Sequence, residues 1–227
     1  MSSHVGAFSS SVGTKIVIGL TGLALFLYLI THIAGNLLVF LGPAIFNEYS
    51  HALLSNPLIP VVEIGLVLIF IIHIFKTVRM FLSNQQARPV RYVRKKSAGR
   101  PSRKSLASST MIVSGLWLLL FVVIHVRQFK YGTEYVTRET GIRDLYRLEM
   151  ENFASPLLVT FYVLSMLIVG SHLWHGISSA FQSLGAADAK WTPRLLATGK
   201  ALAILLAGGF IFIALWAHFS QSGWVRV

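Results

Sequence analysis

The feature that most constrains this chain is a set of five apolar segments, each long enough to cross a bilayer as a helix. A helix needs about 20 mostly apolar residues to span the hydrocarbon. Helix-ending and helix-starting signals separate the segments, as at Gly42-Pro43, Asn56-Pro57 and Ser155-Pro156. We predict an all-α integral membrane protein, a single membrane domain over residues 1–227. Its expected spans are residues 15–41, 58–82, 106–126, 156–184 and 195–219.

Composition agrees with a membrane protein and excludes several kinds of site. Of the 227 residues, 54% are hydrophobic and only 12% are charged, about half the charged share of a soluble domain. There is no cysteine, so this chain forms no disulfide and ligates no iron–sulfur cluster or other thiolate metal site. A redox centre held here must use histidine, methionine or oxygen ligands.

The formal charge of +12 is distributed unevenly along the chain. Most of the excess lies in the loop after the second span, which holds basic residues from Arg88 to Lys104 and no acid. The loop after the first span has no lysine or arginine. The positive-inside rule therefore predicts a cytoplasmic N-terminus and an external C-terminus. The charge indicates topology, lipid contact or a docking surface, and it does not indicate nucleic-acid binding.

The segment between the third and fourth spans carries acids and bases in balance. It is long enough for a short amphipathic helix, and its Leu145, Leu148 and Met150 would then lie on the outer surface of the membrane.

Five histidines lie within the predicted spans, where a titratable side chain is costly and usually has a function. They are His32, His73, His125, His172 and His175. Any one of them alone is equally well explained by a hydrogen bond to a neighbouring helix. A rise of 1.5 Å per residue sorts them into two levels. His32 and His125 fall toward the outside, and His73 faces His172 or His175 toward the cytoplasm.

Two imidazoles from facing helices can ligate one haem iron from both sides, which favours electron transfer over oxygen binding. Two such levels would make a five-helix bundle that encloses two haems. Glycines such as Gly22 and Gly115 would let a flat macrocycle, or another helix, approach the backbone. A catalytic zinc site usually needs three ligands at one point, and no HExxH spacing is present. A proton relay should include carboxylates, and the spans contain essentially one, Glu63.

The order and spacing of these histidines resemble a known family. The matching stretches are "LITHIAGNLLVF", "VVEIGLVLIFIIHIF", "FVVIHVRQF", "SHLWHGISSAFQSLG" and "TPR". Together they cover nearly the whole chain and are similar to the dihaem cytochrome b (b558-type) membrane anchor of succinate dehydrogenases and fumarate reductases. Each stretch alone is only moderately specific, and their order over five spans is what makes the resemblance strong.

The resemblance implies the ligand pairs and leaves one histidine over. It makes His73 and His172 the ligands of the haem nearer the cytoplasm, and His32 and His125 the ligands of the outer haem. It leaves His175 as a contact to a haem propionate or the quinone pocket, or as a helix–helix hydrogen bond. Lys76, Arg79, Arg127 and Lys130 lie near span ends, where they would pair with propionates or snorkel to lipid headgroups.

The resemblance also implies a function. The chain would anchor a flavoprotein subunit and an iron–sulfur subunit on the cytoplasmic side of the bacterial inner membrane. It would carry electrons through two haem b groups to menaquinone or another quinone. The dicarboxylate site would lie elsewhere in the complex, which can form a higher oligomer. Glu63, near the outer end of the second span, would exchange protons with the quinone, or would stabilise its helix as a first-turn acid.

Other functions remain open at this point. The chain is also compatible with a cytochrome b subunit of a hydrogenase or formate dehydrogenase. A small transporter or channel that uses histidines for protons or metal would show no visible absorption. A structural anchor without haem would not need all four ligand positions, which are occupied here.

Overall fold

The computed structural model describes residues 10–87, 110–186 and 190–221 and contains five helices long and apolar enough to cross a membrane. Between them lie a short 3-10 helix, Leu37–Leu41, and two short helices, α2 (Pro43–Leu54) and α6 (Leu145–Ala154). In the described residues the only strand pairing is an isolated bridge in the hairpin at residues 130–144. The long helices are α1 (Ser11–Asn36), α3 (Ile59–Gln86), α5 (Met111–Phe129), α7 (Pro156–Ser183) and α8 (Trp191–Gln221).

The predicted fold class is confirmed as an all-helical chain with five spans, although the helix ends differ from the expected ones. Helices α1 and α8 begin earlier than expected and α3, α5 and α8 end later, because polar residues continue them beyond the apolar run, as in Ser83–Gln86 at the end of α3. Helix α7 matches its expected span to within one residue. The first span ends as the 3-10 turn Leu37–Leu41. Residues 106–109 of the expected third span, and the basic loop at residues 88–104, lie outside the described residues.

Helix α7 lies at the centre of the bundle and packs against α1, α5 and α8, while α3 packs mainly on α1. Small residues allow the close approaches. A Cβ on Gly170 would lie 3.0 Å from the Ala207 side chain, and one on Gly19 would lie 3.4 Å from the Ala180 carbonyl oxygen. Lipid tails are as apolar as the helix surface, so the hydrophobic effect does not drive helices together in a membrane. Close packing at small residues drives their association instead.

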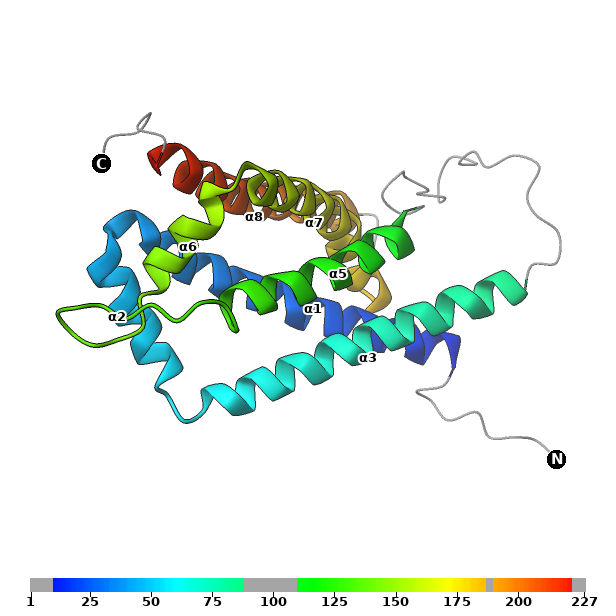
Figure 1. The fold of residues 1–227 in the computed structure, drawn as a ribbon. Coiled ribbons are helices and arrows are strands. Elements are labelled where there is room, and N and C mark those ends of the chain that lie inside the picture. The colour runs from blue at the N-terminus through cyan, green and yellow to red at the C-terminus, as the bar shows by residue number, and fades with distance from the viewer. Residues whose placement is uncertain (1–9, 88–109, 187–189, 222–227) are drawn as a thin grey trace.

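The bundle has two different ends (Figure 1). Helices α2 and α6 and the 130–144 hairpin cover one end, which we call the capped end. We call the other end, where α1 begins, the basal end. Helix α2 starts directly after the first span because Gly42 adopts a φ of 93°, which glycine tolerates, and Pro43 occupies the first helical position.

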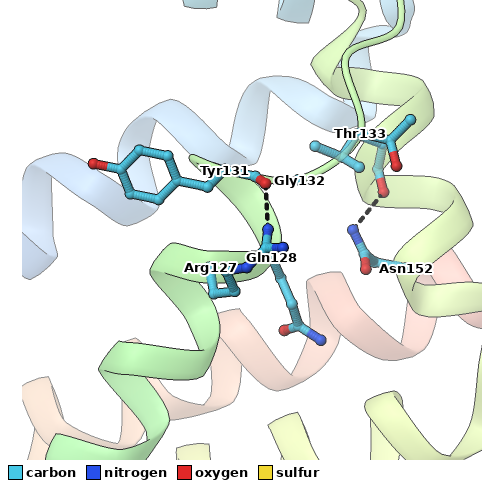
Figure 2. A pocket seen from close by; sticks show the side chains of 7 residues that line it. Arg127, Gln128, Tyr131, Gly132, Thr133 and Asn152 are labelled. Carbon is cyan, nitrogen blue, oxygen red and sulfur yellow. Dashed lines mark hydrogen bonds between the residues drawn. The ribbon is translucent and has the colours of Figure 1, made fainter.

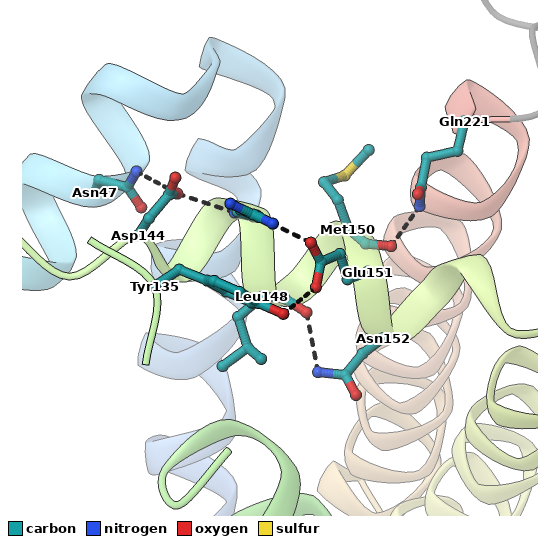
Figure 3. A network of polar contacts seen from close by, with 9 residues as sticks. Asn47, Tyr135, Asp144, Leu148, Met150, Glu151, Asn152 and Gln221 are labelled. Carbon is teal, nitrogen blue, oxygen red and sulfur yellow. Dashed lines mark hydrogen bonds and ion pairs between the residues drawn. The ribbon is translucent and has the colours of Figure 1, made fainter. Parts of the chain in front are cut away.

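A polar network holds the capped end together (Figure 3). The buried Asn47 of α2 donates to Asp144 Oδ1 at 2.8 Å and accepts from the Tyr146 backbone N–H at 2.9 Å. Asp144 is also the N-cap of α6, because it accepts from the Arg147 N–H at 3.0 Å. Arg147 in turn pairs with Glu151 at 2.8 Å. The network fixes α6 across the ends of the long helices.

The amphipathic helix predicted between the third and fourth spans is present as α6, at the capped end of the bundle. Leu148 is only 5% exposed and packs inward, whereas the charged Arg147 and Glu151 face outward. Helix α3 carries no buried residue at all, so apolar side chains along it face outward. With five such spans the chain is a multi-pass membrane protein.

Candidate metal centre

The first histidine pair lies near the capped end of the bundle and joins α1 to α5. The ring centroids of His32 and His125 are 5.8 Å apart, and the two ring planes are nearly perpendicular, at 88°. Metal–imidazole bonds of about 2 Å place the centroids of two rings on opposite sides of one metal about 6 Å apart. The two imidazoles, which we call the capped-end couple, therefore have the separation of a shared metal.

Aromatic rings enclose the capped-end couple. Tyr28 stacks on His32 with centroids 5.4 Å apart and planes at 15°, and Phe210 of α8 lies 5.7 Å from the same ring. Phe121 stacks on His125 at 5.6 Å and 25°. Offset stacked rings of this kind stabilise each other and exclude water, so both imidazoles are held in an apolar surrounding.

The second pair, His73 of α3 and His172 of α7, lies nearer the basal end, and we call it the basal couple. The His172 imidazole is within electrostatic range of His73. The depth of the basal couple along the bundle follows from its contacts. Thr21 of α1 contacts His73, and Ser114 of α5 contacts His172. Thr21 precedes His32 by the same eleven residues that separate Ser114 from His125. The two levels are therefore about 16 Å apart along the helix axes.

Hydroxyl groups orient both imidazoles of the basal couple. Thr21 Oγ1 lies 3.0 Å from His73 Nδ1, and Ser114 Oγ lies 2.9 Å from His172 Nδ1. Each hydroxyl also donates its single hydrogen to a carbonyl oxygen of its own helix, at 2.7 Å for Thr21 and 3.0 Å for Ser114. The hydroxyl must then accept from the histidine, so Nδ1 bears the ring proton and Nε2 keeps its lone pair. This is the tautomer that ligates a metal through Nε2.

His125 of the capped-end couple has the same arrangement with a phenol. Tyr162 donates its hydroxyl hydrogen to Gln128 Oε1 at 2.6 Å and lies 3.3 Å from His125 Nδ1. No hydroxyl of the described residues hydrogen-bonds to His32. Its Nδ1 lies 3.5 Å from the amide nitrogen of Asn36, which also donates to the His32 carbonyl at 2.7 Å.

These residues fit a flat cofactor whose metal is held by two imidazoles. In the described part of the chain, no three histidine, aspartate or glutamate side chains form a group that could hold a metal ion. Each couple brings two imidazoles within range of each other. A Cβ on Gly22 would lie 3.2 Å from His73 Cε1, and one on Gly115 would lie 3.7 Å from His172 Cε1. Glycine at these two positions keeps the space beside the imidazoles clear, and the donor set is that of a haem with two histidine ligands.

His175 lies one helical turn beyond His172 and is half-buried. It is within electrostatic range of His172, and no described residue hydrogen-bonds to its imidazole. Its sequence-based assignment as a contact to a propionate, to a quinone or to another helix stays a prediction.

Glu63 forms an ion pair with Lys130, which follows α5, so the pair bridges two helices near the capped end. The side chains are 38% and 43% exposed. Glu63 is the fifth residue of α3 and lies beyond its first turn, which contains no acid. This position weakens the interpretation as a first-turn acid. The pair gives Lys130 a carboxylate partner, and its contact with a propionate or a lipid headgroup stays a prediction.

Of the other basic residues at span ends, Arg127 donates to the carbonyl of Tyr131. Lys76 and Arg79 lie in the last turns of α3, toward the basal end. Their assignment to propionates or to lipid headgroups stays a prediction.

An open pocket of about 550 Å³ lies between the end of α5 and helix α6 (Figure 2). Arg127, Gln128 and Asn152 contribute its polar lining. Gln128 accepts the hydrogen of Tyr162, which in turn contacts His125. A chain of polar contacts therefore runs from the pocket to the capped-end couple.

One acidic residue near this couple was missed from the sequence. Glu149 of α6 is only 4% exposed, although the sequence suggested that it was one of several acids balancing bases in an external loop. Its spacing from Leu145 and Phe153, four residues on either side, places all three on one helix face and is the signal that could have identified it.

Known proteins offer no guide to this arrangement, because no family model, curated protein or solved structure matches the chain.

Proposed function

We propose that the chain is the membrane-anchor cytochrome b subunit of a succinate:quinone oxidoreductase. It would carry electrons through two haem b groups between an iron–sulfur subunit and membrane quinone. The observation that supports this most is the fixed tautomer of three histidines. His73, His125 and His172 each donate Nδ1–H to a hydroxyl whose own hydrogen is bound elsewhere, which leaves Nε2 ready to ligate at two levels.

The histidines have distinct roles in this proposal. His73 and His172 ligate the iron nearer the iron–sulfur subunit, and His32 and His125 ligate the iron nearer the capped end. Bound haem supplies one-electron carriage, and ligation from both sides leaves no open position for oxygen. Hydroxyl acceptors at Nδ1 hold the imidazole planes and raise the basicity of the ligating nitrogen.

The ion pair of Glu63 and Lys130 supports a quinone site near the capped end. Both side chains are partly exposed on the side of the bundle, where a lipid-soluble quinone has access. Glu63 is within electrostatic range of Tyr28, which stacks on His32. Lys130 can donate to a quinone oxygen, and Glu63 can accept or release the proton that accompanies each electron.

The orientation and partners follow from the distribution of charge in the sequence. A basal end facing the cytoplasm of a bacterial inner membrane agrees with the basic segment between α3 and α5. A flavoprotein subunit and an iron–sulfur subunit dock on that side in this proposal. They hold the dicarboxylate site, and this chain holds haem and quinone.

The direct test is haem content. The full chain, purified from membranes, should give a dithionite-reduced minus oxidised spectrum of b type and two haems per chain in a pyridine haemochrome assay. His51→Ala, in the exposed face of α2, should keep both. A folded, helical and colourless protein would overturn the proposal and favour the transporter alternative.

The partner subunits separate the leading proposal from the other quinone-linked complexes. The complex isolated from native membranes should contain a flavoprotein and an iron–sulfur subunit, and succinate should reduce its haem. Reduction by hydrogen or by formate alone would instead assign the chain to a hydrogenase or formate dehydrogenase.

A further inference from the structure

One lysine lies inside a membrane-spanning helix, about one turn below the surface of the hydrocarbon. Lys200 is the tenth residue of α8, so its Cα lies about 14 Å from the basal end of that helix. The 31 residues of α8 are about 46 Å long, whereas the hydrocarbon core is about 30 Å thick. If the excess length is shared between the two ends, Lys200 lies about 6 Å inside the basal edge of the hydrocarbon.

The Lys200 ammonium lies against the indole of Trp174, which belongs to the neighbouring helix α7. Its Nζ is 4.7 Å from the centroid of the Trp174 ring, a distance at which a cation is attracted to the face of an aromatic ring. Helices α7 and α8 pack closely beside this contact, since a Cβ on Gly199 would lie 3.5 Å from Ile177 Cβ. The pair of Lys200 and Trp174 therefore lies along a tight helix–helix seam.

No described residue gives Lys200 an anionic partner. Helices α7 and α8 contain no aspartate or glutamate, and both ion pairs of the described residues lie at the capped end. An indole compensates an ammonium only in part, and an uncompensated charge is costly at the edge of the hydrocarbon. The charged side chains of residues 190–221 are all basic, namely Lys190, Arg194 and Lys200. The charge of this site is therefore complemented by an anion from outside the chain.

The pair faces away from the basal couple. Trp174 follows His172 by two residues, which places it about 200° further around α7. The Trp174 side chain is 39% exposed, and Lys200 is exposed as well. A haem ligated by His172 would lie on the opposite side of α7, so the geometry does not favour a propionate as the anion. It favours a ligand that reaches the bundle from the surrounding membrane.

Exposed apolar side chains continue the same two helix faces toward the capped end. Leu167, two turns before Trp174, is 57% exposed, and Ile204, one turn after Lys200, is 60% exposed. The seam thus presents a cation and an indole near the interface and aliphatic surface deeper in the bilayer. A phospholipid has the same order, because its charged headgroup lies at the interface and its acyl chains fill the hydrocarbon.

We propose that Lys200 and Trp174 bind the phosphate headgroup of an anionic phospholipid in the basal leaflet, with an acyl chain along Leu167 and Ile204. The basic residues of this segment attract anionic lipid in preference to zwitterionic lipid. The depth of Lys200 favours a lipid over a soluble anion. This inference goes beyond the proposed function and uses none of the haem ligands.

Native mass spectrometry of the purified full chain tests the site, with phosphatidylglycerol and phosphatidylcholine of identical acyl chains as the probes. The wild type should retain phosphatidylglycerol more tightly. Lys200→Gln should weaken that binding about fivefold, the effect expected of one basic residue near anionic headgroups, and Lys200→Arg should restore it. Lys15→Gln removes the same charge from an exposed lysine of α1 at the basal end and should bind lipid as the wild type does.

Fluorescence quenching by phosphatidylglycerol that is brominated in its acyl chains locates the lipid. The chain has five tryptophans, and the component of the quenching that Trp174→Phe removes reports on this site. In phosphatidylcholine vesicles with a small fraction of the brominated lipid, that component should be strong in the wild type and in Lys15→Gln, and weak in Lys200→Gln.

Three results would overturn the inference. Equal retention of the two lipids by the wild type would do so without any variant. Displacement of phosphatidylglycerol by inorganic phosphate would show a site for free anions. Unchanged lipid binding in Lys200→Gln, together with loss of partner subunits from the complex, would show that this face binds protein. The haem content of Lys200→Gln should equal that of the wild type, so the lipid site and the haem function can fail separately.

Discussion

The two histidine couples are built differently although each joins two helices. Threonine and serine hydroxyls at 3.0 Å and 2.9 Å hold the basal couple, with Gly22 and Gly115 beside the rings. Stacked aromatic rings surround the capped-end couple, and α6 covers it, with only His125 bonded to a hydroxyl. The basal imidazoles are thus fixed by hydrogen bonds, and the capped-end imidazoles mainly by packing.

Under the proposed function, this difference would give two haems with the same ligand type unequal properties. Hydrogen bonding to the ligand and burial around it are the means by which a protein tunes a haem. Each imidazole of the basal couple has a hydroxyl partner at Nδ1, and no carboxyl group of the described residues is hydrogen-bonded to either ring. The capped-end couple has one such partner, Tyr162 at His125.

Removal of a ligand should produce the largest effect and test whether the couples are independent. His172→Ala or His73→Ala should remove one of two haems per chain, and His32→Ala or His125→Ala should remove the other, as counted by pyridine haemochrome. His175→Ala should keep both. Loss of haem in His175→Ala but not in His172→Ala would show that the basal couple has been assigned wrongly.

Glu149 should make the stability of the capped end depend on pH. Burial raises its folded-state pKa to about 8, above the value of an unfolded glutamate. The folded state therefore holds a proton that the unfolded state releases, and stability falls as pH rises from about 4.5 to about 8. Each pKa unit corresponds to about 1.4 kcal/mol, so the loss amounts to several kcal/mol.

Thermal unfolding in detergent, followed by circular dichroism, measures this loss. Glu149→Gln should unfold at nearly the same temperature across that range, and Glu139→Gln, at an exposed acid of the hairpin, should follow the wild type. Equal pH dependence in all three proteins would show that Glu149 is not the buried acid responsible.

The hydroxyl partners should give smaller and distinguishable effects at the two levels. Tyr162→Phe should raise the potential of the capped-end haem alone, because a ligand that loses its Nδ1 acceptor stabilises ferric iron less. Thr21→Val should raise the potential of the basal haem alone. Mutating such partners typically lowers metal affinity by about 10–100-fold, which haem titration into depleted protein can measure. A shift in both haems from either variant would contradict the separation of the couples.

The smallest effect is expected from a single methyl group beside the basal couple. A Cβ on Gly22 of α1 would lie 3.2 Å from His73 Cε1, whereas nothing lies within 4 Å of a Cβ on Gly65 of α3. Gly22→Ala should shift the ring slightly and alter the basal haem spectrum at a cost of about 1 kcal/mol. Gly65→Ala should match the wild type. Identical spectra for both would show that His73 has room to move.

The sequence predicted the spans well because apolar length is a one-dimensional signal, and it missed what depends on how chain segments meet. Helix α2 was overlooked because Gly42-Pro43 was interpreted as the end of one helix, although Pro43 also begins the next. The inward position of Leu148 was missed because the face of α6 that packs is set by α2 and α8, which lie far away in sequence.

The candidate site shows the same limit. The levels of the histidines follow from counting residues, since helix rise is constant. Their partners do not, because Thr21 and Ser114 reach His73 and His172 only for particular rotations of the helices about their axes. The ion pair of Glu63 with Lys130 and the burial of Glu149 likewise depend on tertiary packing.

The hydroxyl hydrogens of Thr21, Ser114 and Tyr162 are already donated to other oxygens. This has a consequence for how the protein would acquire a cofactor. Because those hydroxyls already dictate which imidazole nitrogen is bare, a chain that binds haem as proposed would need no redistribution of ring protons before loading. In that proposal, membrane insertion and haem loading would be separable events.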